Sequence, residues 1–392
     1  MKIAVLVSGG VDSSVALALL AKEHPAADLT AFYLKIWLED ELAFLGECPW
    51  EEDLWHARAV AERLSIPLEV LSLQTAYHER VVAHALSELA AGRTPSPDLH
   101  CNELVKFGAF MDLIGSGFDR VATGHYATVR QLANGPRLFA ATDPVKDQTY
   151  FLARLSRDQL ARAEFPVGHL HKHEVRALAQ ELGLETQSRK DSQGICFLGK
   201  IPYPEFVRHH LGDAPGDIVD IASGRVLGRH NGLWFHTIGQ RRGLGLAGGP
   251  WFVVAKRIPQ RMLVVAHADH FAEHHRADFE VEALHWIGLP PALDRTPEAL
   301  EVKLRHGPHR IRCVLEAVRE SPPVEASPSW RGLHKQGEAS SEAHATDAAP
   351  TAPADILRVR LESPDPGIAA GQFAVFYRPG HPAECLGSGV IR

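Results

Sequence analysis

Cysteine is scarce in this chain of 392 residues, and its spacing excludes the common cysteine frameworks. The five cysteines are an odd number, lie far apart and include no C-x-x-C pair: Cys48, Cys101, Cys196, Cys313 and Cys385. The apolar start, MKIAVLV, is too short for the core of a signal peptide. We therefore expect no structural disulfide framework and a location in the reducing cytoplasm, where a functional cysteine acts as a thiol or thiolate.

Membrane and metal signatures are missing as well. No stretch approaches the ~20 apolar residues of a membrane span, so we expect no membrane partner. The 23 histidines show neither H-E-x-x-H nor zinc-finger spacing, which argues against a resident metal site. The net charge of −7 gives no global sign of nucleic acid, although phosphate binding depends on where basic residues cluster.

The length predicts two or three domains, because one core rarely serves so long a chain. Over residues 1–204, apolar strand-like runs alternate with amphipathic helical stretches. This alternation predicts an α/β domain whose parallel sheet is covered on both faces. Within it, Asn134-Gly135 lies between two strand-like runs and predicts a β-hairpin attached to that sheet.

After about residue 205 glycine and proline increase and the helical periodicity fades. The short runs GDIVDI, LWFHTIG, WFVVAKR and RMLVVA predict a small mixed domain over 205–275. Later runs such as IRCVLEAV, DILRVRLE and FAVFYRP predict an antiparallel β-barrel over 276–392, with Cys313 and Cys385 in its core. Residues 321–354 are rich in Ser, Ala, Pro and Glu, so we expect a disordered insertion between two barrel strands, or alternatively a partner-binding segment.

The first functional signal is LVSGGVDSS at residues 6–14, where an apolar strand meets a glycine-rich turn and then a helix. Backbone N–H groups at such a turn can hold an anion, and Asp12 can hold magnesium or cap the helix. No lysine follows the glycines, so the loop is not a P-loop of the G-x-x-x-x-G-K-[ST] kind. A plain strand-to-helix turn is the alternative, which the complete S-G-G-V-D-S-S pattern disfavours.

Two cysteines lie in further polar stretches. Cys101, in AGRTPSPDLHCNELVKFG, precedes a helix predicted to begin near Asn102, whose dipole would stabilise a thiolate. Cys196, in SRKDSQGICFLG, has Arg189 and Lys190 nearby, and these basic neighbours favour a thiolate too. Taken one at a time, each cysteine could equally be a packed core residue.

The loop resembles the PP-loop of the ATP pyrophosphatases, and the chain as a whole resembles one family of them, the tRNA-specific 2-thiouridylases. The resemblance rests on SGGVDSS, AGRTPSPDLHCN, ATGHY, KDQTYFL, KDSQGICFLG and HTIGQRRGLG, with GIAAGQFAVFY as a looser match. It extends from residue 1 to about 315 and again from 356. The low-complexity insertion is the one large departure, and it touches none of these motifs.

The resemblance implies that ATP adenylates the C2 oxygen of the wobble uridine of tRNA, with magnesium and with no tightly bound cofactor. A persulfide on Cys196, supplied by a cysteine desulfurase or a relay protein, would then deliver sulfur to C2, giving 2-thiouridine, AMP and pyrophosphate. Cys101 would release the sulfur through a transient disulfide with Cys196, and Asp98 would act as general acid/base. Both cysteines would need a lowered pKa to serve as nucleophiles.

The resemblance also implies the binding residues. The ATP site would comprise Leu6, Val7, Ser8, Gly9, Gly10, Val11, Asp12, Ser13, Leu34 and Gly124. The tRNA contacts would come from Ser96, Pro97, Asp98, Lys146, Asp147, Gln148, Arg305 and His306. Leu34, Ser96 and His306 depart from the residues that are common at these places in the family, and the target base must leave its stack to reach the site.

Three other interpretations stay open. A PP-loop amide or amine ligase would need ATP but no paired cysteines. A tRNA-binding scaffold without turnover would not need the intact loop and both cysteines. An iron–sulfur sulfurtransferase would need three cysteines around a cluster, with Cys48 as the third, although no short cysteine spacing supports it.

Overall fold

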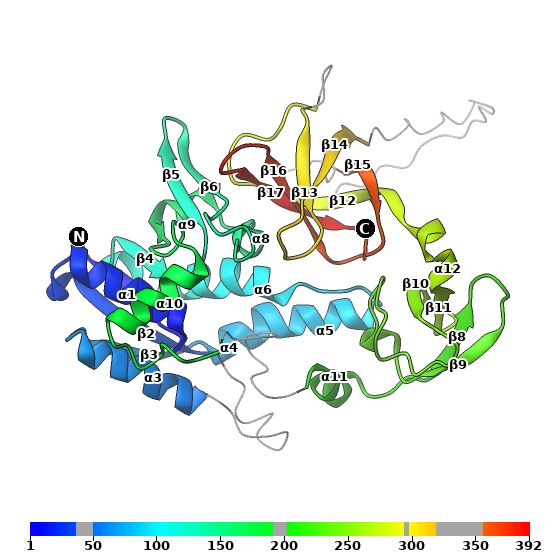
Figure 1. The fold of residues 1–392 in the computed structure, drawn as a ribbon, viewed down its shortest axis with the longest axis horizontal. Coiled ribbons are helices and arrows are strands. Elements are labelled where there is room, and N and C mark those ends of the chain that lie inside the picture. Colours follow the sequence, from blue (N-terminus) through cyan, green and yellow to red (C-terminus); the bar gives the residue numbers. More distant parts are fainter. Residues whose placement is uncertain (37–49, 191–201, 294–297, 319–355) are drawn as a thin grey trace, which may run out of the picture.

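The structure is a computed structural model and describes residues 1–36, 50–190, 202–293, 298–318 and 356–392. Its N-terminal part contains a five-stranded sheet in the order β3-β2-β1-β4-β7, in which every neighbouring pair is parallel. The expected parallel α/β architecture is thereby confirmed (Figure 1). The strands are β1 (Ile3–Leu6), β2 (Leu29–Lys35), β3 (Leu68–Ser72), β4 (Arg120–Thr123) and β7 (Ala163–Glu164).

Alternate side chains of β1 enter two separate hydrophobic clusters. Ile3 and Val5 pack with residues of the helices on one face, whereas Ala4 and Leu6 pack with those on the other. A strand buried on both faces is the usual result when helices cover a parallel sheet. The principal helices of this part are α1 (Val11–Glu23), α3 (Trp50–Arg63), α4 (Gln74–Tyr77), α5 (Ala83–Ala90), α6 (Pro97–His100), α7 (Phe110–Ile114), α8 (Thr149–Leu152), α9 (Arg157–Arg162) and α10 (Lys172–Glu181).

The predicted hairpin forms, but it belongs to a different sheet from the one expected. Strands β5 (Thr128–Leu132) and β6 (Gly135–Phe139) pair across Asn134-Gly135. However, β6 then pairs with the C-terminal strand β17 (Glu384–Ile391), through Cys385 opposite Leu138. The hairpin therefore extends the C-terminal sheet, because a free strand edge pairs with whichever edge the tertiary structure brings beside it.

The central part, entered through α11 (Tyr203–Leu211), is a four-stranded sheet in the order β10-β11-β8-β9. It is mixed, as expected, because β11 runs parallel to β8 whereas the other pairs are antiparallel. The stretch LWFHTIG is not a strand: its Leu233–Phe235 portion forms a 3-10 turn. The strands are β8 (Gly216–Asp220), β9 (Val226–His230), β10 (Trp251–Arg257) and β11 (Met262–His267), followed by α12 (Ala268–Phe271).

The C-terminal part is a closed antiparallel barrel of six strands, with β12 pairing β17 to complete the ring. Cys313 in β14 and Cys385 in β17 are buried, which confirms both as core residues. The insertion predicted at 321–354 lies outside the described residues. Across the parts that the structure describes, no helix combines the length and apolarity of a membrane span. The strands are β12 (Arg276–Trp286), β13 (Leu300–Lys303), β14 (Ile311–Ala317), β15 (Leu357–Asp365), β16 (Phe373–Arg378) and β17.

Candidate active site

The SGGVDSS segment forms a tight turn between β1 and α1, as the sequence predicts. The hydroxyl groups of Ser13 and Ser14 both donate to the carbonyl oxygen of Gly10, at 3.1 and 2.8 Å. Gly9 has φ +72°, and a Cβ there would lie 2.2 Å from the backbone oxygen of Asp53 in α3. Glycine is therefore required at this position by both conformation and space.

Gly124 of the ATGHY motif packs directly against this loop. A Cβ added to Gly124 would lie 2.5 Å from the backbone nitrogen of Ser13 and 2.7 Å from the carbonyl carbon of Asp12. The motif begins in the last two residues of β4, the neighbour of β1, and continues into the loop after it, so both loops lie at the carboxyl edge of the sheet. Leu34 lies near the end of β2, the other neighbour of β1. Binding sites in open α/β sheets form at this edge.

Asp12 does not cap α1, since the N-cap residue is Gly10 and no side chain caps the helix. Its carboxylate instead accepts hydrogen bonds from two distant residues. The ammonium group of Lys172, the first residue of α10, lies 2.7 and 2.9 Å from the two carboxylate oxygens. The hydroxyl group of Tyr126 donates to Oδ1 at 2.8 Å. Neither Lys172 nor Tyr126 was predicted as a site residue, although Tyr126 completes the ATGHY motif.

Arg189 connects the start of the second cysteine motif with the nucleotide loop. Its guanidinium group donates to the carbonyl oxygen of Gly9 at 2.9 Å and pairs with Asp53 at 2.7 Å. The predicted persulfide carrier, Cys196, lies outside the described residues, as does Cys48. Because Arg189 is anchored at Gly9, the chain enters the Cys196 motif from beside the loop predicted to bind ATP.

The helix that carries Asp98 and Cys101 begins earlier than predicted. It starts at Pro97 and continues from α6 through a π-helical stretch, Cys101–Ala109, into α7. Proline is favoured in the first turn because it lacks the N–H that would have no partner there. Cys101 is consequently one turn inside the helix, so the dipole argument applies to it less strongly than the sequence suggested.

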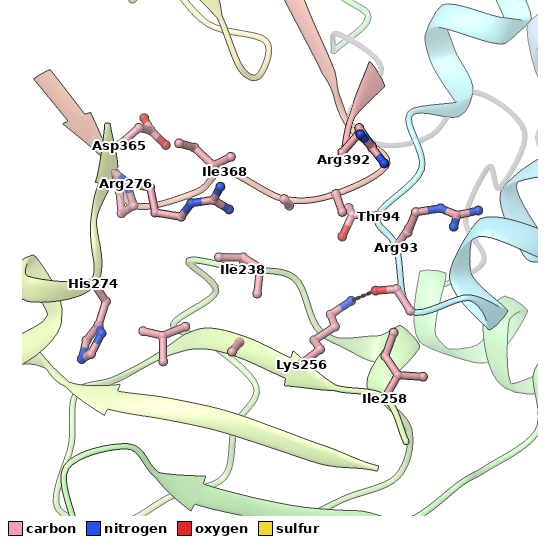
Figure 2. A pocket seen from close by; sticks show the side chains of 16 residues that line it. Arg93, Thr94, Ile238, Lys256, Ile258, His274, Arg276, Asp365, Ile368 and Arg392 are labelled. Carbon is pink, nitrogen blue, oxygen red and sulfur yellow. Dashed lines mark hydrogen bonds between the residues drawn. The ribbon is translucent and has the colours of Figure 1, made fainter. Parts of the chain in front are cut away.

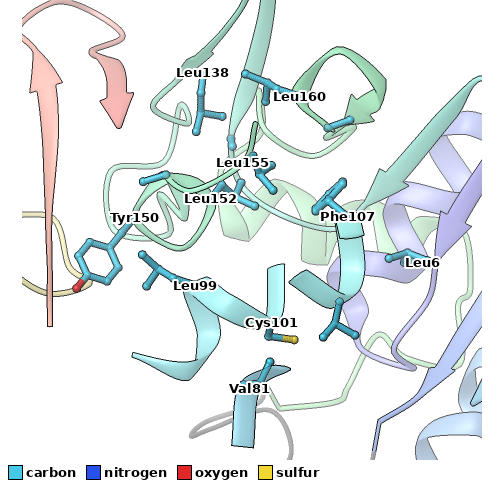
Figure 3. Close-up of a cluster of buried hydrophobic side chains, with 14 of the residues drawn as sticks. Leu6, Val81, Leu99, Cys101, Phe107, Leu138, Tyr150, Leu152, Leu155 and Leu160 are labelled. Atoms are coloured by element: carbon cyan, nitrogen blue, oxygen red, sulfur yellow. The ribbon is translucent and has the colours of Figure 1, made fainter. Parts of the chain in front are cut away.

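Cys101 is buried, and its side chain belongs to a hydrophobic cluster that also contains Leu6 of β1 and Val81 (Figure 3). Asp98 precedes it by three residues, which places both side chains on one side of the helix. On the next turn, Glu103 accepts hydrogen bonds from Arg154 at 2.9 and 3.2 Å. The cysteine is therefore held in a rigid, mainly apolar setting one turn away from the predicted acid/base residue.

Tyr150, which the sequence analysis did not single out, connects several predicted tRNA contacts. Its hydroxyl group donates to the carbonyl oxygen of Phe373 at 3.1 Å and also hydrogen-bonds Ser96. Burial raises the pKa of Tyr150. The charge of Asp98 raises this pKa further, whereas the charge of Arg305 lowers it. The sequence carried one signal for this residue, because Tyr150 closes the KDQTY part of a motif already noted.

Arg305 and His306 extend from the end of β13. The guanidinium group of Arg305 makes a two-pronged contact with Asp365, at 3.0 and 2.7 Å, while 54% of its side chain stays exposed. The ring of His306 stacks on Phe151, with 4.7 Å between centroids. The structure therefore brings the 305–306 pair beside α8, the helix that follows the KDQ segment.

The middle residue of KDQ is not exposed to a ligand in this conformation. Asp147 is 1% exposed, and its Oδ2 accepts a 2.6 Å hydrogen bond from Lys303, which is equally buried. Its Oδ1 accepts from the backbone N–H groups of Ala141 and Thr149. Lys146 and Gln148 remain partly accessible, and Gln148 Oε1 accepts from the Tyr126 backbone N–H at 2.9 Å. Asp147 therefore joins the KDQ segment to the barrel.

This buried pair gives a first prediction. Lys303→Met leaves the Asp147 carboxylate without its cation in the interior, so the free energy of unfolding should fall by about 3–5 kcal/mol. Adding Asp147→Asn should recover much of the loss, since the amide oxygen can still accept from the two backbone N–H groups. Urea unfolding of both variants measures the two effects. Equal stability of the single and double variants would contradict an ion-pair role.

A cavity of about 290 Å³ lies where the AGRTP segment, the central sheet and the barrel meet. Figure 2 shows Lys256 and Arg276 extending into it, with Thr94 and Ile368 nearby. The Lys256 ammonium group donates to the carbonyl oxygen of Gly92 at 3.2 Å. Burial lowers the pKa of Lys256 to about 8. The cavity thus holds a lysine whose charge opposes folding at neutral pH.

Lys256 should leave a signature in the pH dependence of stability. Between pH 8 and about 10.5 the unfolded chain holds the lysine proton that the folded chain has lost, so native stability rises with pH in this window. Relative to Lys256→Met, the native chain should gain about 1–2 kcal/mol between pH 7 and pH 10, after discounting for solvent screening. Denaturant titrations across this range test the sign. Arg257→Met, at an exposed neighbour, keeps Lys256, so the stability difference between this variant and the native chain should stay constant across the range.

Comparison with known proteins places these features in a family. Family models described as a tRNA methyl transferase HUP domain, a tRNA methyl transferase PRC-barrel domain and an aminomethyltransferase β-barrel domain match residues 1–200, 204–267 and 331–391. The chain is 42% identical to the tRNA-specific 2-thiouridylase MnmA of Porphyromonas gingivalis, over 100% of this chain and 99% of that protein. The chain belongs to the MnmA family. MnmA of Parabacteroides distasonis (39%; 100% and 99%) and MnmA 2 of Bacteroides fragilis (43%; 100% of both) match over the same extent.

Membership of the MnmA family confirms the resemblance found from the motifs. The individual site residues remain predictions, but the structure shows how the MnmA motifs are arranged. SGGVDSS and ATGHY meet at Gly124, and AGRTPSPDLHCN meets KDQTYFL at Ser96 and Tyr150. Among the residues that the structure describes, no group of three or more His, Cys, Asp or Glu side chains could hold a metal ion.

Proposed function

We propose that this chain converts the wobble uridine of tRNA to 2-thiouridine in two steps at one site, using ATP and a cysteine persulfide. The observation that supports this most directly is the arrangement around Cys101. The strand leading to the nucleotide loop contributes Leu6 to the hydrophobic cluster that contains Cys101 and Tyr150. Its full-length relatives carry the name tRNA-specific 2-thiouridylase.

In the first step the uridine O2 attacks the α-phosphorus of ATP. A bond forms between O2 and phosphorus, and the bond to the β-phosphate oxygen breaks, so that pyrophosphate leaves with the electron pair. Asp98 is suited to take the N3 proton, which becomes more acidic as O2 is esterified. The product carries AMP on O2, which turns a poor leaving group into a good one.

In the second step the terminal sulfur of the Cys196 persulfide attacks C2, and AMP leaves with the C2–O bond electrons. The Cys101 thiolate then attacks the Cys196 sulfur, which breaks the sulfur–sulfur bond, leaves one sulfur on C2 and forms a Cys101–Cys196 disulfide. An external dithiol must supply two electrons to reset the cysteines. A cysteine desulfurase or relay protein must supply the next persulfide sulfur, which suits a reducing cytoplasm.

The loop residues 6–13, with Leu34 and Gly124, would bind ATP, and magnesium would neutralise its phosphates. Asp12 fits the magnesium, because each carboxylate oxygen can accept two partners and Oδ2 receives only Lys172 among the hydrogen bonds described. Ser96, Pro97 and Asp98 would contact the flipped base, while Lys146, Gln148, Arg305 and His306 would hold the tRNA around it. We assign residues 1–204, 205–275 and 276–392 to three domains.

Mass spectrometry of tRNA nucleosides tests the proposal. After incubation with ATP, a cysteine desulfurase and cysteine, the native chain should yield 2-thiouridine, and Cys196→Ser should yield none. Absence of 2-thiouridine with the native chain would overturn the proposal. A PP-loop ligase would keep its activity in Cys196→Ser, and a metal cluster would appear as iron and sulfide in anaerobically purified, active protein.

A further inference from the structure

A glycine-rich phosphate loop of the P-loop kind carries its own lysine, and this loop has none. The structure brings a lysine to it from 160 residues away. Lys172 Nζ lies within 2.9 Å of both Asp12 carboxylate oxygens, and only 12% of the Lys172 side chain is exposed. Asp12 is the second residue of α1, so this ammonium group lies at the helix end where backbone N–H groups attract anions.

We propose that Lys172 is the phosphate-facing cation of this active site and stabilises the pyrophosphate that leaves during adenylation. The inference deepens the proposed function, because it assigns a catalytic role to a residue of the same ATP site. As the bond between the α-phosphorus and the β-phosphate oxygen breaks, negative charge grows on that oxygen. An ammonium group already fixed beside the loop stabilises this charge without reorganisation.

Three contacts fix Lys172 at the loop. Its backbone N–H donates to the carboxylate of Asp143 at 3.0 Å, which sets the start of α10. Val175 and Ala179 are buried and hold α10 in the cluster that also contains residues of α1. The Tyr126 hydroxyl group shares Asp12 Oδ1 with the ammonium group, so Asp12 and Tyr126 orient it together.

The second cation near the loop, Arg189, is oriented differently. Its guanidinium group binds the carbonyl oxygen of Gly9 and the carboxylate of Asp53. These contacts point it to the flank of the loop against α3, whereas Lys172 reaches the carboxylate at the helix N-terminus. Lys172 can exchange part of its contact with Asp12 for a phosphate oxygen through small rotations of its flexible chain.

The role can be separated from a merely structural pairing by comparing ligands with and without the pyrophosphate portion. Isothermal titration calorimetry should show at least tenfold weaker binding of ATP and of pyrophosphate to Lys172→Met, with AMP binding changed less than twofold. Lys172→Arg should restore most of the pyrophosphate affinity. Adenylation turnover should fall about 100-fold in Lys172→Met, with a smaller change in KM.

Lys22→Met is the matched control, because Lys22 is exposed in the last turn of the same helix, α1, far from the loop. It should bind all three ligands like the native chain. A parallel loss of AMP and ATP binding in Lys172→Met, or unchanged pyrophosphate binding, would overturn the proposal. If Lys172→Met does not fold, Lys172→Gln takes its place and carries the same expectations. These titrations need no tRNA, so failure of the 2-thiouridine assay and failure of this inference are distinguishable.

Discussion

Cys101→Ser should abolish formation of 2-thiouridine while leaving ATP binding unchanged. The serine hydroxyl group cannot attack the Cys196 sulfur, so the transferred sulfur stays bonded to the enzyme. Consumption of ATP should stop after about one equivalent per active site. The yield of 2-thiouridine should fall by more than about 1,000-fold, which is a typical loss when a catalytic nucleophile is removed. Rapid-quench measurement of AMP gives the amount of ATP consumed, and nucleoside mass spectrometry gives the yield of 2-thiouridine.

A buried hydroxyl group in the apolar cluster around Cys101 carries its own cost of about 1–3 kcal/mol in stability. Cys101→Ala avoids this cost and should show the same loss of product. Cys313→Ala provides the control, since Cys313 is also buried but lies in β14 of the barrel. Multiple turnovers by Cys101→Ala would contradict the assignment of Cys101.

Gly124→Ala should weaken nucleotide binding strongly, although it adds only one methyl group to the chain. The new Cβ would lie within 2.8 Å of three backbone atoms of Asp12 and Ser13, which no side-chain rotation can relieve. The loop must therefore shift, and forcing extra atoms into a packed site costs about 1–3 kcal/mol. We expect ATP binding to weaken by roughly 10- to 100-fold, measured by calorimetry.

Gly117→Ala separates this effect from a general intolerance of alanine. A Cβ at Gly117 meets no atom within 4 Å and Gly117 has no positive φ, so the variant should bind ATP normally. Native ATP affinity in Gly124→Ala would contradict the proposal that the nucleotide binds at the loop that Gly124 contacts.

Features that depend on neighbouring residues could be predicted from the sequence. The strand, turn and helix around SGGVDSS follow from an apolar run, two glycines and a helical periodicity within 20 residues. The Asn134-Gly135 hairpin was equally local. The start of the 97–114 helix was missed because two prolines suggested a loop, whereas Pro97 serves as its first residue.

Features that depend on distant residues could not be predicted. Tyr126 and Lys172 reach Asp12 across 114 and 160 residues, and neither has a spacing that indicates the contact. The burial of Asp147 is similar, since a polar K-D-Q run looks like a solvated loop until Lys303 of the barrel is placed beside it. In each case a charged side chain is explained by a partner that only the tertiary structure supplies.

The pairing of β6 with β17 has a consequence for how the chain can be divided. A fragment ending after the central sheet would keep the β5–β6 hairpin but lose the strand that covers the outer edge of β6. Unpaired N–H and C=O groups along such an edge recruit strands from other molecules. Expression of the nucleotide-binding part by itself should therefore give aggregates, and a soluble fragment would need this hairpin removed or its edge blocked by proline or charge.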